Sequence, residues 1–154
     1  MNMKIERMKE EKLHILTELF HYNDVEQMLS ECAHDIQNKI VDIFVLYQKD
    51  VLIGELRVMY ESADKNYAVR GRRAYIFAFR VREEFQNKGY GTYLLKEVLA
   101  LLEKNGYCEF TVGAEDDNFK AKHIYQNFGF NEFLLRKQEE YQGDAYEYNL
   151  YLKK

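Results

Sequence analysis

The chain reads Gln86-Asn87-Lys88-Gly89-Tyr90-Gly91 between an apolar run and a long amphipathic segment. The preceding run, residues 73–81, is aromatic and apolar without a turn residue, which predicts a buried strand. After the loop, apolar residues recur at helical spacing as far as the Asn-Gly pair at 105–106, which predicts a helix ending there. The first N–H groups of a helix are unpaired and carry positive partial charge, and glycine lets an anion approach them. The loop is therefore predicted to bind phosphate.

Two common phosphate loops do not fit this sequence. A mononucleotide loop requires Gly-Lys-Ser/Thr after its first glycine, but Gly91 is followed by Thr92 and Tyr93. A dinucleotide fingerprint requires a third glycine at the position of Leu94. The remaining pattern, Gln-x-x-Gly-x-Gly, resembles the diphosphate loop of the GNAT superfamily, the acyl-CoA-dependent N-acyltransferases. A solvated turn that only starts a helix is the alternative interpretation.

A downstream segment resembles the same superfamily. Residues 109–114 predict a short strand, and residues 118–130 then match the family pattern Asn-x-x-Ala-x-x-x-Tyr-x-x-x-Gly-Phe at every marked position. Asn118 is expected to cap a helix that ends at Gly129. The apolar face of this helix is expected to comprise Ala121, Ile124, Tyr125 and Phe128.

The resemblance spans roughly residues 42–135, including a predicted hairpin at 42–56 with Gly54 in its return strand. It implies an α/β fold in which residues 1–154 form a single domain with a mixed, mostly antiparallel sheet flanked by helices. The apolar patterns predict strands at 4–8, 43–47, 51–59, 73–81, 110–114, 132–136 and 146–152. They also predict helices at 9–20, at 24–38, after the glycine loop and at 118–128, and a polar loop at 61–72.

Composition limits the classes of function. The net charge of −4 and pI near 5.6 argue against wholesale nucleic-acid binding. The basic cluster at residues 70–73 is either a solvated loop or a contact for an acidic group of the acceptor or a CoA phosphate. The charged N-terminal residues are unlike a signal peptide, and no apolar run is long enough for a membrane span. Cys32 and Cys108 are expected to be buried thiols in a reduced, cytoplasmic protein.

The resemblance implies acetyl-CoA as co-substrate and no metal. Backbone N–H groups along the glycine loop would bind the diphosphate, helped by the charges of Lys88 and Arg82. The loop residues concerned are Gln86, Asn87, Lys88, Gly89, Tyr90, Gly91 and Thr92. In the family, the pantetheine arm pairs with the strand before the loop, which here places it on the backbone of Phe79, Arg80 and Val81. Asn118 is either a helix cap, a cofactor contact, or both.

Tyr125 matches the tyrosine that, in the family, interacts with the departing sulfur. A phenol is a weaker acid than a thiol by about 1.5 pKa units, so a hydrogen bond to the developing negative charge is the expected role. His123 is expected at the surface. The general base stays open between Glu55, Glu115, Asp116 and water, because Tyr75 occupies the position where one branch of the family has an acid.

The resemblance implies an N-acetyltransferase that moves an acetyl group from acetyl-CoA directly to a primary amine of a small molecule or protein. The acidic residues Glu139, Glu140, Asp144 and Glu147 either favour a cationic acceptor or serve ordinary solvation. The alternative is an inactive module of the same fold that binds acyl-CoA or a protein. No nucleic acid or membrane is expected as a partner, and a homodimer stays an open alternative.

Overall fold

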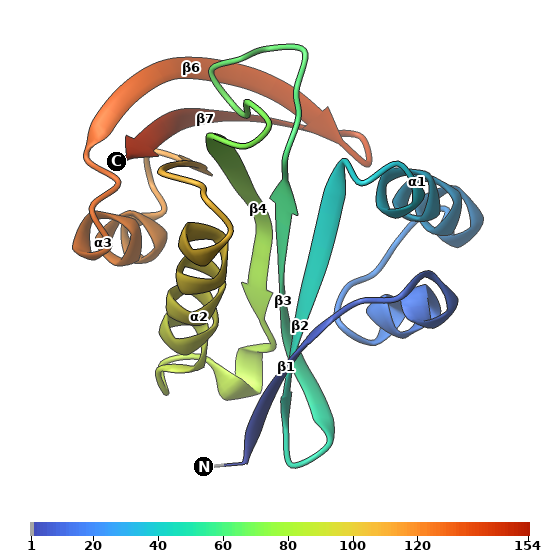
Figure 1. Ribbon diagram of the computed structural model, residues 1–154. Coiled ribbons are helices and arrows are strands. Elements are labelled where there is room, and N and C mark those ends of the chain that lie inside the picture. The colour runs from blue at the N-terminus through green and yellow to red at the C-terminus, as the bar shows by residue number, and fades with distance from the viewer. Residues whose placement is uncertain (1) are drawn as a thin grey trace.

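A computed structural model describes residues 2–154 (Figure 1). Its strands are β1 (Met3–Arg7), β2 (Val41–Gln48), β3 (Val51–Met59), β4 (Arg73–Val81), β5 (Glu109–Ala114), β6 (Glu132–Tyr141) and β7 (Asp144–Lys153). Its helices are α1 (Val25–Gln37), α2 (Tyr90–Lys104) and α3 (Phe119–Asn127), with two 3-10 helices, η1 (Glu10–Glu18) and η2 (Glu83–Phe85). Within these residues the strands form one seven-stranded sheet, ordered β1-β2-β3-β4-β5-β7-β6, in which only β4 and β5 are parallel. The predicted α/β class with a mostly antiparallel sheet is confirmed.

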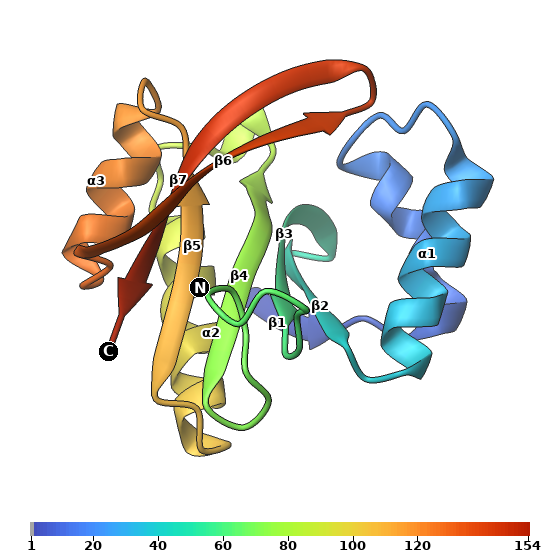
Figure 2. The same cartoon turned by 90° about the horizontal axis from the view of Figure 1, so that it is seen from above.

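Helices cover both faces of the sheet (Figures 1 and 2). On one face, α2 and α3 pack side chains such as Leu94, Val98 and Tyr125 against the central strands. On the other face, η1 and α1 bury Leu16 and Met28 among others. The sequence of each helix explains its packing against the sheet, because apolar residues at helical spacing give the helix one face to bury. No helix in residues 2–154 is both long enough and apolar enough to cross a membrane.

The predicted elements are confirmed with two differences. The segment predicted as a helix at 9–20 is a 3-10 helix, whose buried residues Leu13 and Leu16 are spaced three apart and so share one face at three residues per turn. The strand predicted at 132–136 continues to Tyr141 because it pairs with β7 along its whole length. Asp24 caps α1 by accepting a hydrogen bond from the N–H of Gln27 at 3.0 Å.

The two cysteines differ. Cys32 is buried as predicted, whereas the prediction for Cys108 is wrong because this residue is exposed. Cys108 lies in the turn between α2 and β5, one residue before the buried part of β5 begins at Glu109.

β4 contains a β-bulge at Ala78, which the sequence pattern did not predict. Its pairing with β3 shifts register there, so that Ala78 and Phe79 oppose a single residue of β3. Ala78 adopts a positive φ of 47°, which is uncommon for a residue other than glycine. Because side chains alternate along a strand, the extra residue reverses the faces that follow. Phe79 therefore packs near Tyr125 on the α3 side, and Arg80 lies over Phe20 on the η1 side.

The β6–β7 hairpin arches from the sheet toward the segment between η1 and α1 (Figures 1 and 2). At its tip, the side-chain oxygen of Gln142 accepts a hydrogen bond from the N–H of Asn23 at 2.6 Å. The rings of Tyr141 and Phe20 lie 6.2 Å apart between centroids. These contacts join residues more than a hundred positions apart and form a roof over one face of the sheet.

Candidate active site

The glycine loop leads from the end of β4 through η2 to the first turn of α2. The Gln86 side chain donates a hydrogen bond to the carbonyl oxygen of Val81 at 2.9 Å, which ties the loop to β4. Asn87 and Gly89 adopt left-handed backbone conformations, with φ of 62° and 85°. Within the described residues, no backbone or side-chain acceptor pairs with the N–H groups of residues 87–92. Consecutive unpaired donors at a helix N-terminus are the arrangement that binds phosphate.

The loop borders a cavity of about 510 Å³, here called the α2–α3 groove. Its lining residues are Phe79, Arg80, Val81, Phe85, Gln86, Asn87, Gly89, Tyr90, Gly91, Thr92, Asn118, Lys120, Ala121, His123, Ile124 and Tyr125. The groove thus brings together the predicted catalytic and cofactor-binding residues except Lys88 and Arg82. Lys88 is exposed and lies beside the groove.

β4 offers an open edge to this groove. It pairs with β5 only through residues 73–76, whereas its other edge continues to pair with β3 as far as Val81. In the part of the chain that the structure describes, the main-chain groups of residues 79–81 therefore have no partner strand on the groove side. An extended, amide-bearing ligand can add to such an edge like another strand.

Tyr125 lies in the same groove. Only 8% of its surface is exposed, and its ring packs 6.4 Å from Phe79 and 5.8 Å from Phe130 between centroids. Burial raises the pKa of Tyr125 to about 12, so its hydroxyl keeps its proton near neutral pH. Within residues 2–154, no side chain or carbonyl is hydrogen-bonded to this hydroxyl, which leaves it available to a ligand.

Asn118 both caps α3 and lines the α2–α3 groove. Its side-chain oxygen accepts a hydrogen bond from the N–H of Ala121 at 3.1 Å and so caps α3. It also lines the groove. His123 is exposed as expected and forms part of the groove rim, where its Nε2 lies 3.3 Å from Asn127. Arg82 is bound elsewhere, donating to the carbonyl oxygen of Glu18 at 3.1 Å.

Two of the three carboxylates considered as the general base are bound by arginine side chains. Glu55 is fully buried and accepts hydrogen bonds from Arg57 and Arg80, so it is not a solvated surface carboxylate. A hydrogen bond from Arg136 holds the pKa of Asp116 below its usual value, which makes this carboxylate a weaker base. Glu115 is exposed and does not line the groove.

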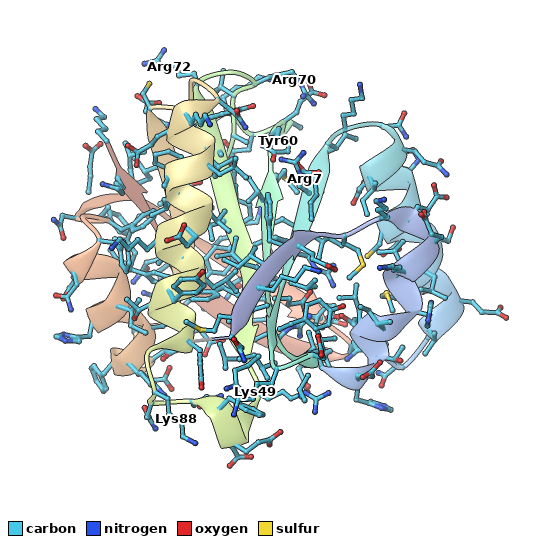
Figure 3. All side chains as sticks on the ribbon, turned by 60° about the horizontal axis from the view of Figure 1, so that its bottom comes forward. Arg7, Lys49, Tyr60, Arg70, Arg72 and Lys88 are labelled. Carbon is cyan, nitrogen blue, oxygen red and sulfur yellow. The ribbon has the colours of Figure 1, made fainter. Side chains whose placement is uncertain are left out.

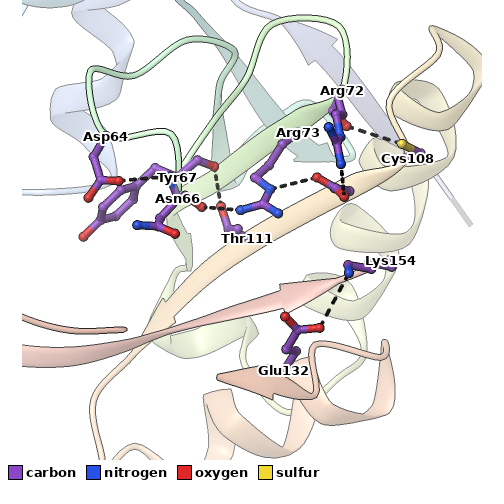
Figure 4. Close-up of polar contacts among 10 residues, drawn as sticks. Asp64, Asn66, Tyr67, Arg72, Arg73, Cys108, Thr111, Glu132 and Lys154 are labelled. Atoms are coloured by element: carbon purple, nitrogen blue, oxygen red, sulfur yellow. Dashed lines mark hydrogen bonds and ion pairs between the residues drawn. The ribbon is translucent and has the colours of Figure 1, made fainter. Parts of the chain in front are cut away.

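The basic cluster at residues 70–73 lies far from the glycine loop. Figure 3 shows Arg70 and Arg72 at the opposite end of the molecule from Lys88. Arg70 pairs with Glu61, while Arg72 and Arg73 pair with Glu109 at 3.3 and 2.9 Å (Figure 4). These internal ion pairs argue against a role in binding the phosphates of a ligand in the α2–α3 groove.

A second cavity, of about 740 Å³, lies beneath the arch and is here called the hairpin cavity. It is lined by Phe20, Arg57, Met59, Ser62, Ala63, Asp64, Tyr67, Tyr75, Phe77, Ala78, Arg80, Lys137, Glu139, Tyr141, Tyr146 and Tyr148. Arg80 and the Ala78 bulge border this cavity, and Arg80 also lines the α2–α3 groove. The linings of the two cavities therefore share Arg80.

Four tyrosines of the hairpin cavity form a cluster, and two of them are hydrogen-bonded to one carboxylate. Glu139 accepts hydrogen bonds from Tyr148 and Tyr146 at 2.9 and 3.0 Å, and the Tyr148 oxygen lies 2.7 Å from that of Tyr67. Because Tyr148 donates to Glu139, it accepts its second hydrogen bond from Tyr67. The Tyr75 ring packs edge-on against Tyr67, with 5.0 Å between centroids. This cluster was not predicted, because tyrosines that alternate with other residues along the last strand indicate only a half-buried strand.

No group of three or more His, Cys, Asp or Glu side chains in residues 2–154 is arranged to hold a metal ion.

Known structures share this architecture. A GNAT family acetyltransferase from Elizabethkingia anophelis with acetyl-CoA bound superposes with a TM-score of 0.69 at 16% identity, covering 99% of this chain and 97% of that one. A ribosomal-protein-alanine N-acetyltransferase from Brucella melitensis gives 0.76 at 14% identity, with coverage of 97% and 98%. An IAA acetyltransferase from Bacillus cereus gives 0.68 at 18% identity, with 98% of both chains covered. At these identities the likeness establishes the fold.

A search of curated proteins finds no match to this sequence. The profile of the acetyltransferase (GNAT) family, in contrast, matches residues 6–130. This range contains the glycine loop, the open edge of β4 and the Tyr125 helix. The chain therefore belongs to the acetyltransferase (GNAT) family.

Proposed function

We propose that residues 1–154 form one N-acetyltransferase domain that moves an acetyl group from acetyl-CoA directly to a primary amine. The observation that carries this proposal is that unpaired loop donors, an open strand edge and the Tyr125 hydroxyl line one groove. Acetyl-CoA carries its acetyl group as a thioester at the end of an amide-bearing arm, and this arm is attached to a diphosphate. Each of these three parts has a matching protein group. Two of the structural neighbours, from Elizabethkingia anophelis and Salmonella typhimurium, are described with acetyl-CoA.

The glycine loop fixes one end of the cofactor. The N–H groups of residues 87–92 hold the diphosphate, and Asn118 lies close enough to the groove to add a side-chain contact. The main chain of residues 79–81 pairs with the amide groups of the arm. Because these contacts use the backbone, they place the thioester without depending on particular side chains.

Tyr125 assists departure of the sulfur. In the transfer, a C–N bond forms, the thioester C–S bond breaks, the amine loses one proton, and the thiolate leaves. The Tyr125 hydroxyl donates a hydrogen bond to the developing negative charge on sulfur. Its raised pKa, about 12, keeps the phenol protonated and makes full proton transfer to a thiolate unfavourable.

The residues that line the α2–α3 groove favour direct transfer of the acetyl group from the thioester to the amine. Among the described lining residues there is no cysteine or serine that could accept the acetyl group first. Cys32 is buried in another cluster and Cys108 lies in the turn before β5. The amine therefore attacks the thioester itself.

The attacking amine must first lose a proton. For a lysine-like amine at neutral pH this costs roughly 4–5 kcal/mol. Since Glu55 and Asp116 are engaged with arginines, we assign proton removal to water. The rate should then rise with pH as the free base becomes more abundant.

A thiol-release assay tests the proposal. Wild-type protein, acetyl-CoA and a panel of amines should release CoA thiol, and Tyr125→Phe should release it far more slowly. Tyr107→Phe, which removes a hydroxyl outside both cavities, serves as control. Saturable acetyl-CoA binding by calorimetry without thiol release from any amine would instead support the inactive, acyl-CoA-binding module.

A further inference from the structure

The floor of the hairpin cavity carries an unbalanced buried charge. Glu55, with 0% of its side chain exposed, accepts hydrogen bonds from Arg57 at 3.2 Å and Arg80 at 2.5 Å. The two arginine side chains are themselves largely buried, at 12% and 27% exposed. Two guanidinium charges against one carboxylate leave one positive charge without a partner.

Neighbouring groups do not supply the missing negative charge. The Tyr22 hydroxyl accepts hydrogen bonds from Arg57 and Arg80 at 3.0 and 3.1 Å, and the Cys32 sulfur lies 3.4 Å from Arg57. Burial raises the pKa of both Tyr22 and Cys32, so both stay neutral near pH 7. A buried cation without a counter-charge is unfavourable, and an anionic ligand would relieve that cost.

Arg80 is placed to meet such a ligand. Its guanidinium lies 4.0 Å over the Phe20 ring, and it borders both the α2–α3 groove and the hairpin cavity. Its Nη1 donates to no acceptor in residues 2–154, whereas Nε and Nη2 are bound to Glu55 and Tyr22. A guanidinium with an open edge in a largely buried site favours a carboxylate, which it binds with short, charge-assisted hydrogen bonds.

The walls above this charge are aromatic. Tyr75 and Phe77 on β4 stack at 5.4 Å, and Tyr146 and Tyr148 on β7 stack at 5.9 Å, between centroids. The acidic lining residues belong to other elements: Asp64 to the loop after β3 and Glu139 to β6, two residues from Lys137. The excess positive charge thus stays at the β3–β4 floor, and the space above it suits a flat or bulky apolar group.

We propose that the acceptor is a free α-amino acid with an aromatic or large apolar side chain. Its carboxylate binds Arg80, beside the Arg57–Glu55 pair, and its side chain lies between the aromatic walls. Because the amine and carboxylate share one carbon, a carboxylate at Arg80 puts the amine beside the residue that lines both the hairpin cavity and the α2–α3 groove. This inference rests on the proposed acetyl transfer and excludes peptide N-termini, whose first residue has no free carboxylate.

Calorimetry with matched ligands tests the carboxylate contact. We expect L-phenylalanine to bind the protein in the presence of CoA at least tenfold more tightly than 2-phenylethylamine or L-phenylalaninamide, which lack the carboxylate. L-Leucine should likewise bind more tightly than 3-methylbutylamine. Equal affinities within each pair, or no binding of either amino acid, would overturn the proposal.

Two variants change the charge in opposite directions. Arg57→Met leaves a neutral Glu55–Arg80 pair and should reduce the preference for phenylalanine over 2-phenylethylamine at least tenfold. Glu55→Gln leaves two positive charges and should increase that preference. Arg70→Met, which removes an arginine paired with Glu61 at the other end of β4, should change neither. If Arg57→Met does not fold, an unchanged preference in Glu55→Gln still contradicts the proposal.

Thiol release measured in parallel separates the two proposals. Selective phenylalanine binding without thiol release would contradict acetyl transfer and support the anion site. Thiol release with 2-phenylethylamine but not with phenylalanine would support acetyl transfer and overturn the anion site. Release with phenylalanine at a higher kcat/KM than with 2-phenylethylamine would support both.

Discussion

The α2–α3 groove and the hairpin cavity lie on either side of β4 but are built from different groups. The groove presents main-chain donors at residues 87–92 and a main-chain edge at residues 79–81. The hairpin cavity presents arginine, glutamate and tyrosine side chains from β3, β4, β6 and β7. A site made of backbone suits one constant ligand, whereas a site made of side chains can be altered by substitution without changing the fold.

The Ala78 bulge joins these two regions. It turns Phe79 toward Tyr125 and Arg80 toward Glu55, so consecutive residues serve opposite cavities. Variants in one region should therefore affect one ligand and spare the other. The following experiments test this separation, beginning with the largest expected effect.

Gly89→Val should reduce acetyl-CoA affinity at least 100-fold, because a side chain at φ +85° strains the loop and covers its N–H groups. Gly71→Val is the matched control, since Gly71 has φ +81° and equally open surroundings but lies outside both cavities. Thermal unfolding should shift similarly in both variants. Equal acetyl-CoA affinities by calorimetry would contradict the assignment of the loop.

Tyr125→Phe should lower kcat about 10- to 100-fold, the loss expected for a hydrogen bond to developing charge. The Kd for acetyl-CoA should change little, because the backbone contacts remain. Steady-state kinetics and calorimetry on the same preparation measure the two quantities. A parallel loss of both would make Tyr125 a packing residue of the groove.

Tyr148→Phe should raise the KM of the acceptor about three- to tenfold and leave acetyl-CoA affinity unchanged. This change removes the hydroxyl that links Tyr67 to Glu139 inside the hairpin cavity. Titration of acceptor and of acetyl-CoA separates the two effects. A change confined to acetyl-CoA affinity would show that the acceptor and acetyl-CoA do not bind in separate cavities.

Asn118→Ala and Asp24→Ala should each destabilise the protein by about 1 kcal/mol, because each residue caps a helix. Only Asn118 lines the α2–α3 groove, so only its replacement should also weaken acetyl-CoA binding, by about fivefold. Urea denaturation and calorimetry provide the comparison. Equal acetyl-CoA affinities in the two variants would limit Asn118 to capping.

Ionisation of the buried phenols should have the smallest effect near neutral pH. Burial raises the pKa of Tyr125 and of Tyr146 to about 12, so neither phenol ionises in the folded protein between pH 7 and about pH 11. Activity should rise with pH until the attacking amine is deprotonated and should then level off, without a falling limb below about pH 11. Since unfolded tyrosine ionises near pH 10, stability should decline as the pH rises from about 10 toward 12. A fall in kcat centred below pH 10 would contradict a protonated Tyr125 donor.

The sequence allowed prediction of the groove because its parts are short and local. The glycine loop and the helix after Asn118 each carry their own pattern, and strand and helix periodicity places them in order. The exposed Cys108 and the 3-10 geometry of η1 differ from expectation because both depend on how a segment packs.

The hairpin cavity was not predictable in the same way. Its residues extend from Phe20 to Tyr148 and meet only when the β6–β7 hairpin crosses the sheet. The burial of Glu55 and the bulge at Ala78 likewise depend on partners in other strands, which no local pattern in β3 or β4 encodes.

The position of β7 has a consequence for the order in which the protein matures on the ribosome. β7 lies between β5 and β6, although it follows both in the chain. Residues 79–125 are synthesised before residue 144, so we expect the α2–α3 groove to assemble while the hairpin cavity still lacks its roof. Protease cleavage of the free fragment 1–143 should therefore occur within β6 and spare α2.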